Sequence, residues 1–525
     1  MMQSKTGMSS IAVAVKLLAA TVALGVMGSA SAAADTTRVI VAFKAGSAAN
    51  VKAAVKAAKG NVKHDIFGMS AMAIEVPAVA LKGLANNPNV EYVEEDVIRK
   101  PFALTAPSTG TPYSAGQLVP YGIPMVQADQ LSDINAGNRR VCIIDSGIDR
   151  AHEDLAGQAA NMTGVNDAGT GNWFTDENHH GTHVAGTIAA LNNSGTGVVG
   201  VNANGKLKLH IVKVFGAAGW AYSSTLASAA NQCGSYGANV ISMSLGGGRS
   251  SRTEQRAFDT LQGKGVLSIA AAGNDGNTVI SYPAGYASVM MVGALDENKA
   301  WATFSQYNTK VEISGPGVGV LSTVPMNSGS APTLAVGGVT YEAGAMDGSP
   351  VSVVTAPLAD FGTGEAPASG SMSGKVCLIA RGNIDFATKV TNCKNSGGVA
   401  AVLYNNVAGA FGGTMGTTVA TIPSVTATDT DGAKMKTQLG QSATVGVKAN
   451  SYAYFDGTSM ATPHVSAVAA LVWSYYPACT GAQIRSTLGK SAQDLGPVGR
   501  DTKFGFGLVQ AKAARDRIAS LGCGN

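Results

Sequence analysis

Short apolar runs alternate with Ala-rich stretches of helical periodicity along the middle of the chain. The apolar runs are rich in Val, Ile and Ala and lack polar alternation, which is typical of strands that are buried on both faces. The intervening stretches would supply the crossover helices of a parallel sheet. The expected strands are residues 140–144, 209–214, 240–243, 266–271 and 289–292. The pattern therefore predicts an α/β fold with a parallel sheet between two layers of helices.

A different pattern precedes this region. Residues 36–100 combine strand-like runs with short helical stretches, which predicts a small α+β unit. The expected strands are 38–43, 71–76 and 89–94, and the expected helices are 50–59 and 79–86. The following segment, 101–116, contains Pro, Ser, Thr and Gly without periodicity. It is predicted to be an exposed linker that is open to proteolysis.

The alternation of strands and helices is interrupted between about residues 326 and 451. Here strand-like runs at 375–380 and 399–404 surround one helical stretch at 385–396. This predicts an inserted, β-rich domain. The earlier pattern then resumes with Ser459 and a long helical stretch from Thr462 to Tyr476.

The first 34 residues have the pattern of a signal peptide. Lys5 and Lys16 come before an apolar stretch at 17–27, and small residues follow at 28–34. The apolar stretch is shorter than the roughly 20 residues that span a bilayer, so a membrane anchor is the weaker interpretation. We expect an exported protein that is secreted to the extracellular medium, without a membrane anchor in its mature form.

Composition agrees with export and argues against some partners. Charged residues make up 13% of the 525 residues and the net charge is +4, without a basic cluster, so nucleic acid is not expected as a partner. An even number of cysteines in an exported chain favours disulfides, and the lack of a CxxC spacing argues against zinc. Spacing alone leaves every pairing open. Because the cysteines fall two by two into separate stretches, we expect Cys142–Cys233, Cys377–Cys393 and Cys479–Cys523.

Residues with functional side chains, or with extended backbone that could pair with another strand, follow three of the predicted strands. They are Asp145, the segment Ser244–Gly247 and Asn274. The carboxyl ends of parallel strands meet at one edge of a sheet, and ligands bind there. We therefore expect these residues to converge on one site, where the extended backbone of Ser244–Gly247 would pair with a substrate strand.

Three motifs supply the groups for acyl transfer by a serine nucleophile. They are Asp145-Ser146-Gly147, His180-Gly181-Thr182-His183 and Gly457-Thr458-Ser459-Met460-Ala461. A serine hydroxyl needs a base to remove its proton, and an imidazole held by a carboxylate does this near neutral pH. We assign Ser459 as the nucleophile, His180 as the base and Asp145 as the orienting acid. Pro463 is tolerated most easily near the start of a helix, so Ser459 is expected in the first turn.

Several of these residues have competing interpretations. His179 and His183 compete with His180 for the role of base, although His183 is better interpreted as a hydrogen-bonded core residue. The histidine cluster could bind a metal, but it lacks the Glu that a helical zinc hydrolase carries. Ser459 could instead cap a helix. In the catalytic interpretation, the Asn274 amide and the Ser459 backbone N–H would stabilise an oxyanion.

The three motifs resemble those of the subtilisin-like serine proteases, the subtilase family, and the similarity extends over residues 117–325 and 452–514. The resemblance implies a secreted serine endopeptidase that hydrolyses peptide bonds through an acyl-enzyme. It selects His180 over its neighbours and places Asn274 at the family's oxyanion amide. An esterase of the α/β-hydrolase fold would need Gly-x-Ser-x-Gly and the order Ser, Asp, His. A catalytically inactive binding protein is disfavoured because all four catalytic positions are intact.

The resemblance also implies a division of the chain into domains. A propeptide of ferredoxin-like α+β fold would act as an intramolecular inhibitor and be removed by cleavage between about Lys100 and Gly116. The insertion resembles a protease-associated domain through Arg381-Gly382-Asn383 and Ile422–Val425. The implied boundaries are 1–34 for the signal peptide, 35–103 for the propeptide, 104–326 with 451–525 for the subtilisin-like catalytic domain, and 327–450 for the inserted domain.

Two further sites follow from the resemblance. A structural Ca²⁺ site made of oxygen ligands would take Gln117, Asp154, Leu191, Asn193, Thr196 and Val198. Protein and peptide substrates would contact Ser244, Leu245, Gly246, Ala272, Gly273 and Ser281. No Asp or Glu is evident at the floor of the first pocket, so a large apolar or aromatic residue is expected before the cleaved bond, at position P1. The enzyme is expected to act as a monomer.

Overall fold

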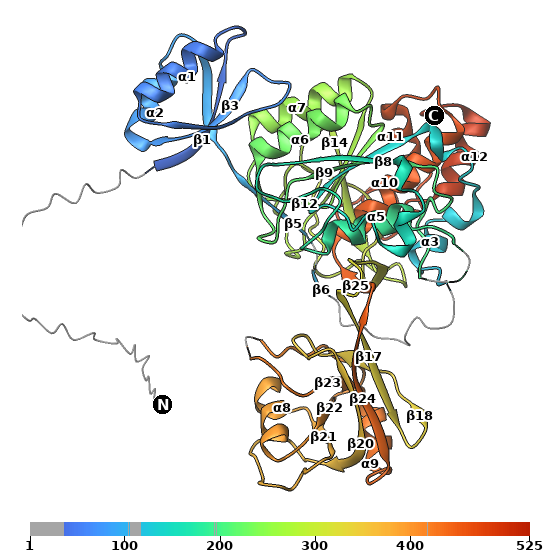
Figure 1. The fold of residues 1–525 in the computed structure, drawn as a ribbon. Helices are drawn as coiled ribbons and strands as arrows, with labels where there is room; N and C mark the ends of the chain where they lie inside the picture. Colours follow the sequence, from blue (N-terminus) through green and yellow to red (C-terminus); the bar gives the residue numbers. More distant parts are fainter. Residues whose placement is uncertain (1–35, 103, 106–116, 194, 196, 417) are drawn as a thin grey trace, which may run out of the picture.

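The computed structural model describes residues 36–102, 104–105, 117–193, 195, 197–416 and 418–525. The predicted signal peptide and residues 106–116 of the predicted linker lie outside this part of the chain. Figure 1 shows a small N-terminal α+β unit, a central α/β body, and a β-rich domain that is joined to the central body by long strands. No helix within the described ranges is long and apolar enough to cross a membrane.

A seven-stranded sheet forms the centre of the molecule. Its strand order is β15-β14-β13-β11-β7-β9-β8, and every neighbouring pair is parallel. The parallel α/β prediction is confirmed, and all five expected strands are present. The edge strands β8 and β15 were not predicted, because both contain polar residues and lack a continuous apolar run. The bounds are β7 (Arg140–Asp145), β8 (Met162–Asn166), β9 (Lys208–Lys213), β11 (Val240–Met243), β13 (Leu267–Ala271), β14 (Val289–Leu295) and β15 (Val311–Pro316).

Helices cover both faces of this sheet. Alternate residues of β7 enter separate cores, with Val141 and Ile143 on one face and Cys142 and Ile144 on the other. One core packs against α5 (His180–Ala189), α10 (Thr458–Tyr475), α11 (Gly481–Lys490) and α12 (Ala511–Leu521), and the other packs against α6 (Ser223–Ser235) and α7 (Arg252–Gly263). Shorter helices are α3 (Gly122–Met125), α4 (Glu153–Ala156), η2 (Ala128–Gln130), η3 (Ala136–Asn138) and η4 (Ala159–Asn161).

The N-terminal unit is an antiparallel sheet in the order β2-β3-β1-β4, with helices on one face. The α+β prediction is confirmed, but β2 was missed because its side chains are mostly polar and exposed. The bounds are β1 (Thr36–Phe43), α1 (Ala48–Ala57), β2 (Asn61–Asp65), β3 (Ala71–Pro77), η1 (Ala78–Ala80), α2 (Leu81–Ala85) and β4 (Val90–Glu95).

The free face of this antiparallel sheet packs on α6 and α7 of the central body, where Ile40 lies in one cluster with Ala227 and Ala257 (Figure 1). Two carboxylates of the unit accept hydrogen bonds from the starts of these helices. Glu94 accepts from the Thr253 backbone N–H over 2.8 Å, and Asp96 accepts from that of Ser224 over 2.9 Å. Negative charge at a helix N-terminus is stabilising, so these contacts fix the unit on the two helices.

The chain that leaves this unit is bound to the central body. Strand β5 (Ile98–Pro101) pairs in antiparallel fashion with both β10 (Ala221–Tyr222) and β12 (Leu245–Gly246). Beyond it, β6 (Leu104–Thr105) pairs with β25 (Tyr452–Asp456), which also pairs with β16 (Val320–Thr323). The prediction of an exposed linker is therefore wrong at Pro101, because strand addition to two sheet edges supplies partners that a local pattern cannot reveal.

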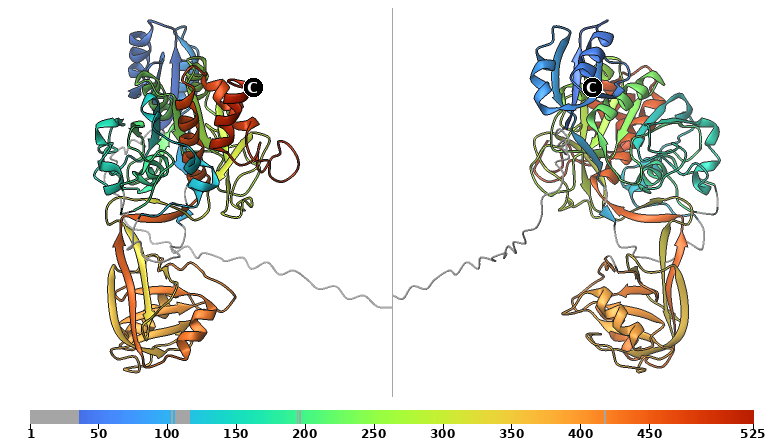
Figure 2. Two further views of the ribbon diagram at one scale, coloured as in Figure 1. Left: turned by 90° about the vertical axis from the view of Figure 1, so that its right-hand side faces the viewer. Right: turned by 60° about the vertical axis from the view of Figure 1, so that its left-hand side comes forward.

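The inserted domain has its own eight-stranded sheet, in the order β18-β17-β24-β20-β21-β22-β23-β19, and its own apolar cores. Figure 2 shows that β17 and β24 extend from this domain towards the central body. The helix and both strands expected within the insertion are present. The bounds are β17 (Gly329–Val336), β18 (Val339–Thr340), β19 (Gly344–Ala345), β20 (Ser352–Asp360), β21 (Val376–Ala380), α8 (Phe386–Asn395), β22 (Ala400–Tyr404), β23 (Ser424–Ala427), α9 (Asp429–Lys436) and β24 (Ser442–Asn450).

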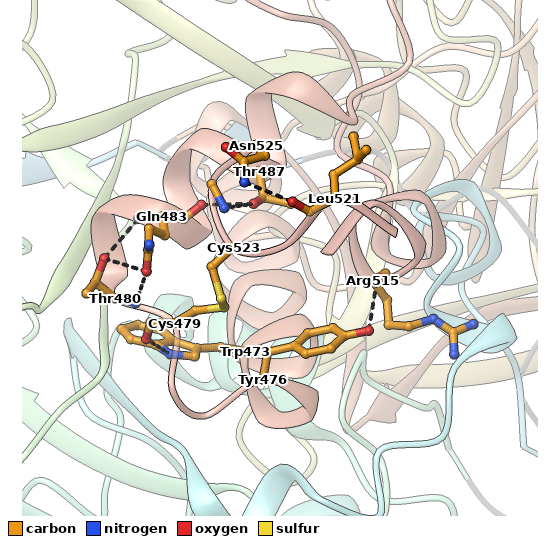
Figure 3. The surroundings of a disulfide bond; sticks show 11 residues. Trp473, Tyr476, Cys479, Thr480, Gln483, Thr487, Arg515, Leu521, Cys523 and Asn525 are labelled. Atoms are coloured by element: carbon orange, nitrogen blue, oxygen red, sulfur yellow. Dashed lines mark hydrogen bonds between the residues drawn. A yellow bond between two sulfur atoms is a disulfide. The ribbon is translucent and has the colours of Figure 1, made fainter. Parts of the chain in front are cut away.

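Three disulfides connect the six cysteines, and the predicted pairing is confirmed. Cys142–Cys233 joins β7 to α6, and Cys377–Cys393 joins β21 to α8. Cys479–Cys523 joins the segment before α11 to the end of the chain (Figure 3). Near this third bridge, the Trp473 indole N–H donates to the Cys479 carbonyl over 2.8 Å.

Replacing Cys479 and Cys523 together by serine should lower the free energy of unfolding of the central body by about 4 kcal/mol. The bridge closes 44 residues, and its loss increases the conformational entropy of the unfolded chain. Denaturant unfolding in a Ser459→Ala background, which prevents self-digestion, measures the change. The double serine variant at Cys377 and Cys393 is the matched control, because its bridge lies in the inserted domain. An unchanged midpoint in the Cys479/Cys523 variant would contradict the expectation.

Candidate active site

The three residues of the predicted catalytic triad stand at the end of a strand and at the starts of two helices. Asp145 is the last residue of β7, His180 is the first residue of α5, and Ser459 is the second residue of α10. Oδ1 of Asp145 lies 2.8 Å from Nδ1 of His180, and both side chains are buried. A carboxylate in this position holds the Nδ1 proton and leaves Nε2 as the basic nitrogen.

The neighbouring histidines have other surroundings. His183 is buried, with Nε2 at 3.0 Å from the Val320 carbonyl and 3.1 Å from the Ala453 carbonyl. Burial lowers the pKa of His183 to about 3, so it stays neutral. His179 lies before α5 in a left-handed backbone conformation. His183 is thus the hydrogen-bonded core residue that the sequence predicted.

A second buried carboxylate, Asp176, holds the start of α5 in place. It accepts hydrogen bonds from the Thr182 backbone N–H over 2.9 Å and from the Ser146 hydroxyl over 2.9 Å. These contacts connect the segment after β7 to the helix that carries His180. Burial raises the pKa of Asp176. Sequence reasoning missed this residue, because an acid shortly before a helix usually caps it at the surface.

Ser459 and Ser244 exchange two hydrogen bonds. The Ser459 hydroxyl donates to the Ser244 carbonyl over 2.7 Å, and the Ser244 hydroxyl donates to the Ser459 carbonyl over 2.7 Å. The Ser459 carbonyl lacks a helical donor because Pro463, four residues further on, has no N–H. Pro463 therefore frees the group that connects α10 to Ser244. His180 Nε2 has no hydrogen-bond partner among the described residues.

The carbonyl group of Phe102 lies between two donors of the site. Its oxygen accepts from Asn274 Nδ2 over 2.9 Å and from the Ser459 backbone N–H over 3.4 Å. The Asn274 amide is itself oriented, since its Oδ1 accepts from the Thr458 backbone N–H over 2.9 Å and from the Thr458 hydroxyl over 2.8 Å. Two converging donors on one carbonyl oxygen are the arrangement of an oxyanion hole. Thr458 was not predicted as part of the site.

The backbone before Phe102 lies between two strands, β10 and β12. Leu245 pairs with Pro101 and Gly246 pairs with Lys100, while the Phe102 N–H lies 3.0 Å from the Ser459 hydroxyl and 3.2 Å from the Ser244 carbonyl. Three predicted substrate-binding residues, Ser244, Leu245 and Gly246, thus contact the chain's own segment. The strand β10 on the other side was missed, because its two residues give no pattern in the sequence.

The remaining predicted substrate residues border the same site. A Cβ atom at Gly246 would lie 2.6 Å from a ring carbon of Phe102, so only glycine leaves room for this ring. Ala272 and Gly273 follow β13, and the Gly273 N–H donates to the Thr458 hydroxyl over 3.1 Å. Ser281 Oγ lies 3.4 Å from the uncharged amide of Gln306.

Five of the six predicted calcium ligands lie together. Asp154 is buried, and its carboxylate accepts from the Val198 N–H over 2.8 Å and from the Asn193 amide over 3.0 Å. The Gln117 amide lies 2.5 Å from the Leu191 carbonyl oxygen. Thr196 lies outside the described residues. Burial raises the pKa of Asp154, and a cation would compensate for this desolvation. One carboxylate, two amides and backbone carbonyls fit the oxygen ligands of calcium. Among the described residues, no three or more His, Cys, Asp or Glu side chains lie together so that they could hold a metal ion.

Comparison with known sequences settles the family. The sequence model of the subtilase family matches residues 137–344 and 327–507, which together span more than half of the chain. The chain belongs to the subtilase family. The sequence model of the fervidolysin N-terminal prodomain matches residues 36–96, the antiparallel N-terminal unit. This subtilase is therefore a subtilisin-like serine protease with an N-terminal prodomain.

Individual relatives agree with this assignment. Subtilisin DY of Bacillus licheniformis is 42% identical over 220 residues, which cover 40% of this chain and 77% of the relative. Alkaline elastase YaB of Bacillus sp. (strain YaB) is 30% identical over 455 residues, which cover 86% of this chain and 81% of the relative. A psychrophilic subtilisin-like protease from the Antarctic psychrotroph Pseudoalteromonas sp. AS-11 has a solved structure that is similar with a TM-score of 0.61. It is 44% identical and covers 78% of this chain and 100% of its own. The fold is the subtilisin-like α/β fold.

Proposed function

We propose that this subtilase is an exported endopeptidase that forms an acyl-enzyme on Ser459 and removes its own prodomain by cutting after Phe102. One observation carries the proposal: the Phe102 carbonyl lies against the Ser459 N–H and the Asn274 amide. The chain passes this point in extended pairing on both sides, with β12 before it and with β25 after it. This is how a substrate would present a peptide bond to the nucleophile.

The reaction follows from these contacts. The Ser459 hydroxyl turns from the Ser244 carbonyl to Nε2 of His180, which takes its proton as the oxygen attacks the carbonyl carbon. Asp145 stabilises the resulting imidazolium. The charge that develops on the carbonyl oxygen is stabilised by Asn274 Nδ2 and the Ser459 N–H. His180 then gives the proton to the leaving amine, and water releases the acyl group by the reverse path.

Phe102 also supports the proposed preference for a large apolar or aromatic P1 residue. Gly246 leaves space for its ring, and Ser281 and Gln306 are uncharged. A chain that keeps its own segment between β10 and β12 excludes other protein substrates from this place, so the prodomain is proposed to inhibit the enzyme until it leaves.

A peptidyl phosphonate tests the nucleophile and the P1 preference together. We expect the mature enzyme to be labelled by an Ala-Ala-Pro-Phe diphenyl phosphonate, with the added mass on the peptide that contains Ser459. The matched reagent that ends in Lys should react at least about tenfold more slowly, because a buried pocket without a carboxylate leaves the ammonium unpaired. Labelling of another residue, or faster labelling by the Lys reagent, would refute the assignment.

Export is proposed from the signal-like first 34 residues, and the three disulfides are consistent with an oxidising compartment. For residues 327–450, we propose a protease-associated domain that restricts access to the site. A cavity of about 590 Å³ lies between this domain and the central body, lined by His179, Phe455, Met346 and Phe386 among others. Its lining by His179, the residue before His180, supports a role in substrate access.

A structural calcium ion is proposed at Asp154, where it would connect Gln117, α4 and the loop from Leu191 to Val198. Excess EDTA should shorten the half-life of the mature enzyme on heating by at least about tenfold, because removal of a ligand of the native state lowers its stability. The Asp154→Asn variant should show a short half-life that EDTA no longer changes. Asp149→Asn, with a partly exposed side chain in the preceding loop, is the control. A half-life of the wild type that does not respond to EDTA would exclude the site.

A further inference from the structure

One residue of the segment before Phe102, Arg99, forms a buried ion pair with Glu254 of the central body. The proposed function assigns no role to this pair. In β5 the apolar Ile98 is 49% exposed, whereas the charged Arg99 is 0% exposed. This is the reverse of an ordinary strand at a surface. Side chains alternate between the two faces of a strand, and the pairing of β5 with β10 and β12 directs Arg99 into the central body.

Arg99 meets a matching acceptor there. Its Nε donates to Oε1 of Glu254 over 2.9 Å and its Nη2 donates to Oε2 over 2.7 Å, and both side chains are fully buried. Nη2 also donates to the Arg249 carbonyl over 2.9 Å. Two parallel hydrogen bonds from one planar group are specific to a guanidinium, because a lysine ammonium is a single point of charge.

The pocket is made by the enzyme and not by the prodomain. Glu254 lies in the first turn of α7, and the Tyr286 hydroxyl donates to its Oε2 over 2.6 Å. Gly247 forms a wall, since a Cβ atom there would lie 2.6 Å from the Ile98 carbonyl oxygen and 3.2 Å from Arg99 Nη1. The acidic group, its orienting hydroxyl and the glycine wall all remain in place when the prodomain leaves.

We propose that this pocket is the subsite for the fourth residue before the cleaved bond, P4, and that Glu254 selects arginine there in protein substrates. The inference rests on the proposed function, since Arg99 is P4 only if cleavage follows Phe102. A P4 arginine would restore the hydrogen bonds of the Glu254 carboxylate. An apolar P4 side chain would cover that carboxylate without pairing it, which is costly for a buried charge.

Peptide substrates test the selection directly. The mature enzyme is given acetyl-X-Lys-Pro-Phe p-nitroanilides in which X is Arg, Lys, Leu or Ala. We expect kcat/KM for Arg to exceed that for Leu by about 10- to 100-fold, with Lys between them. Equal values for Arg and Leu would overturn the P4 inference but leave the proposed function intact. No cleavage of any of the four peptides would instead overturn the proposed function.

Two variants that each remove one negative charge from α7 provide a matched comparison. Glu254→Gln should lower the Arg to Leu ratio of kcat/KM at least about fivefold, whereas the exposed Asp259→Asn should leave the ratio unchanged. An equal effect of both variants would show a general effect of charge on α7. It would refute the selection of a P4 arginine by Glu254.

Self-cleavage of the full chain gives a second measurement that does not need a mature variant. Arg99→Leu should slow release of the prodomain, because Glu254 loses its partner. The double variant Arg99→Leu with Glu254→Leu should recover part of the lost rate. Self-cleavage of Arg99→Leu at the wild-type rate would overturn the inference.

Discussion

Replacing Ser459 by alanine should lower casein hydrolysis and prodomain release by about 10⁴- to 10⁶-fold, the upper figure being carried over from subtilisin. Without Oγ no acyl-enzyme forms, so only binding and oxyanion stabilisation remain to assist attack by water. Both reactions are measured with the purified full chain. The contacts of Ser459 through its backbone N–H and carbonyl do not need the hydroxyl, so the variant is expected to fold.

Ser466 offers a matched control for this experiment. It is a buried serine on the same helix, α10, and lies seven residues beyond Ser459. Ser466→Ala should keep hydrolysis within about threefold of the wild type. Substantial casein hydrolysis by Ser459→Ala, or an equal loss in both variants, would contradict the role of Ser459.

The second large effect is expected at Asn274. Asn274→Leu keeps the approximate size of the side chain but removes the donor to the Phe102 carbonyl, which lies 2.9 Å away. We expect kcat to fall by about 10²- to 10³-fold, a magnitude that again comes from subtilisin, and KM to change less than threefold. The reason is that the hydrogen bond strengthens as charge develops on the oxygen in the transition state. Peptide kinetics of the self-matured variant measure both constants.

Asn277 lies in the same loop and provides the control, because its side chain accepts from the Val279 N–H and is partly exposed. Asn277→Ala should leave kcat within about twofold of the wild type. A loss at Asn274→Leu that falls on KM and spares kcat would show a role in substrate binding only.

The sheet and much of the candidate site could be predicted because both depend on local patterns. Apolar runs gave the parallel strands, and the rule that their carboxyl ends share an edge brought Asp145, Ser244 and Asn274 together. The expectation from Pro463 that Ser459 lies in the first turn of a helix is confirmed, since α10 begins at Thr458. The helical stretch itself was expected only from Thr462, and the Ser244 hydroxyl satisfies the Ser459 carbonyl that Pro463 leaves without a donor.

Residues whose partners are distant in the sequence were missed. Nothing in the run from Ile98 to Pro101 shows that it pairs with β10 and β12, more than 100 residues away. Arg99 and Glu254 are residue types that usually lie at the solvated surface. Each is buried here because it pairs with the other, and 155 residues separate them in the sequence. Thr458 stands inside one of the three motifs, but its role of orienting the Asn274 amide could not be predicted from the motif. Asp176 also acts by orienting other groups and lies outside the three motifs.

The position of the first cut tests the central claim most directly. Purified full chain is allowed to process itself, and the released prodomain and the new N-terminus are identified by intact mass and N-terminal sequencing. The account predicts a prodomain that ends at Phe102 and an enzyme that begins at Ala103, with no cut in Ser459→Ala. A first cut at another bond between Ala103 and Gly116 would contradict the account. Cleavage after Phe102 in a sample that contains only the Ser459→Ala variant would contradict it as well.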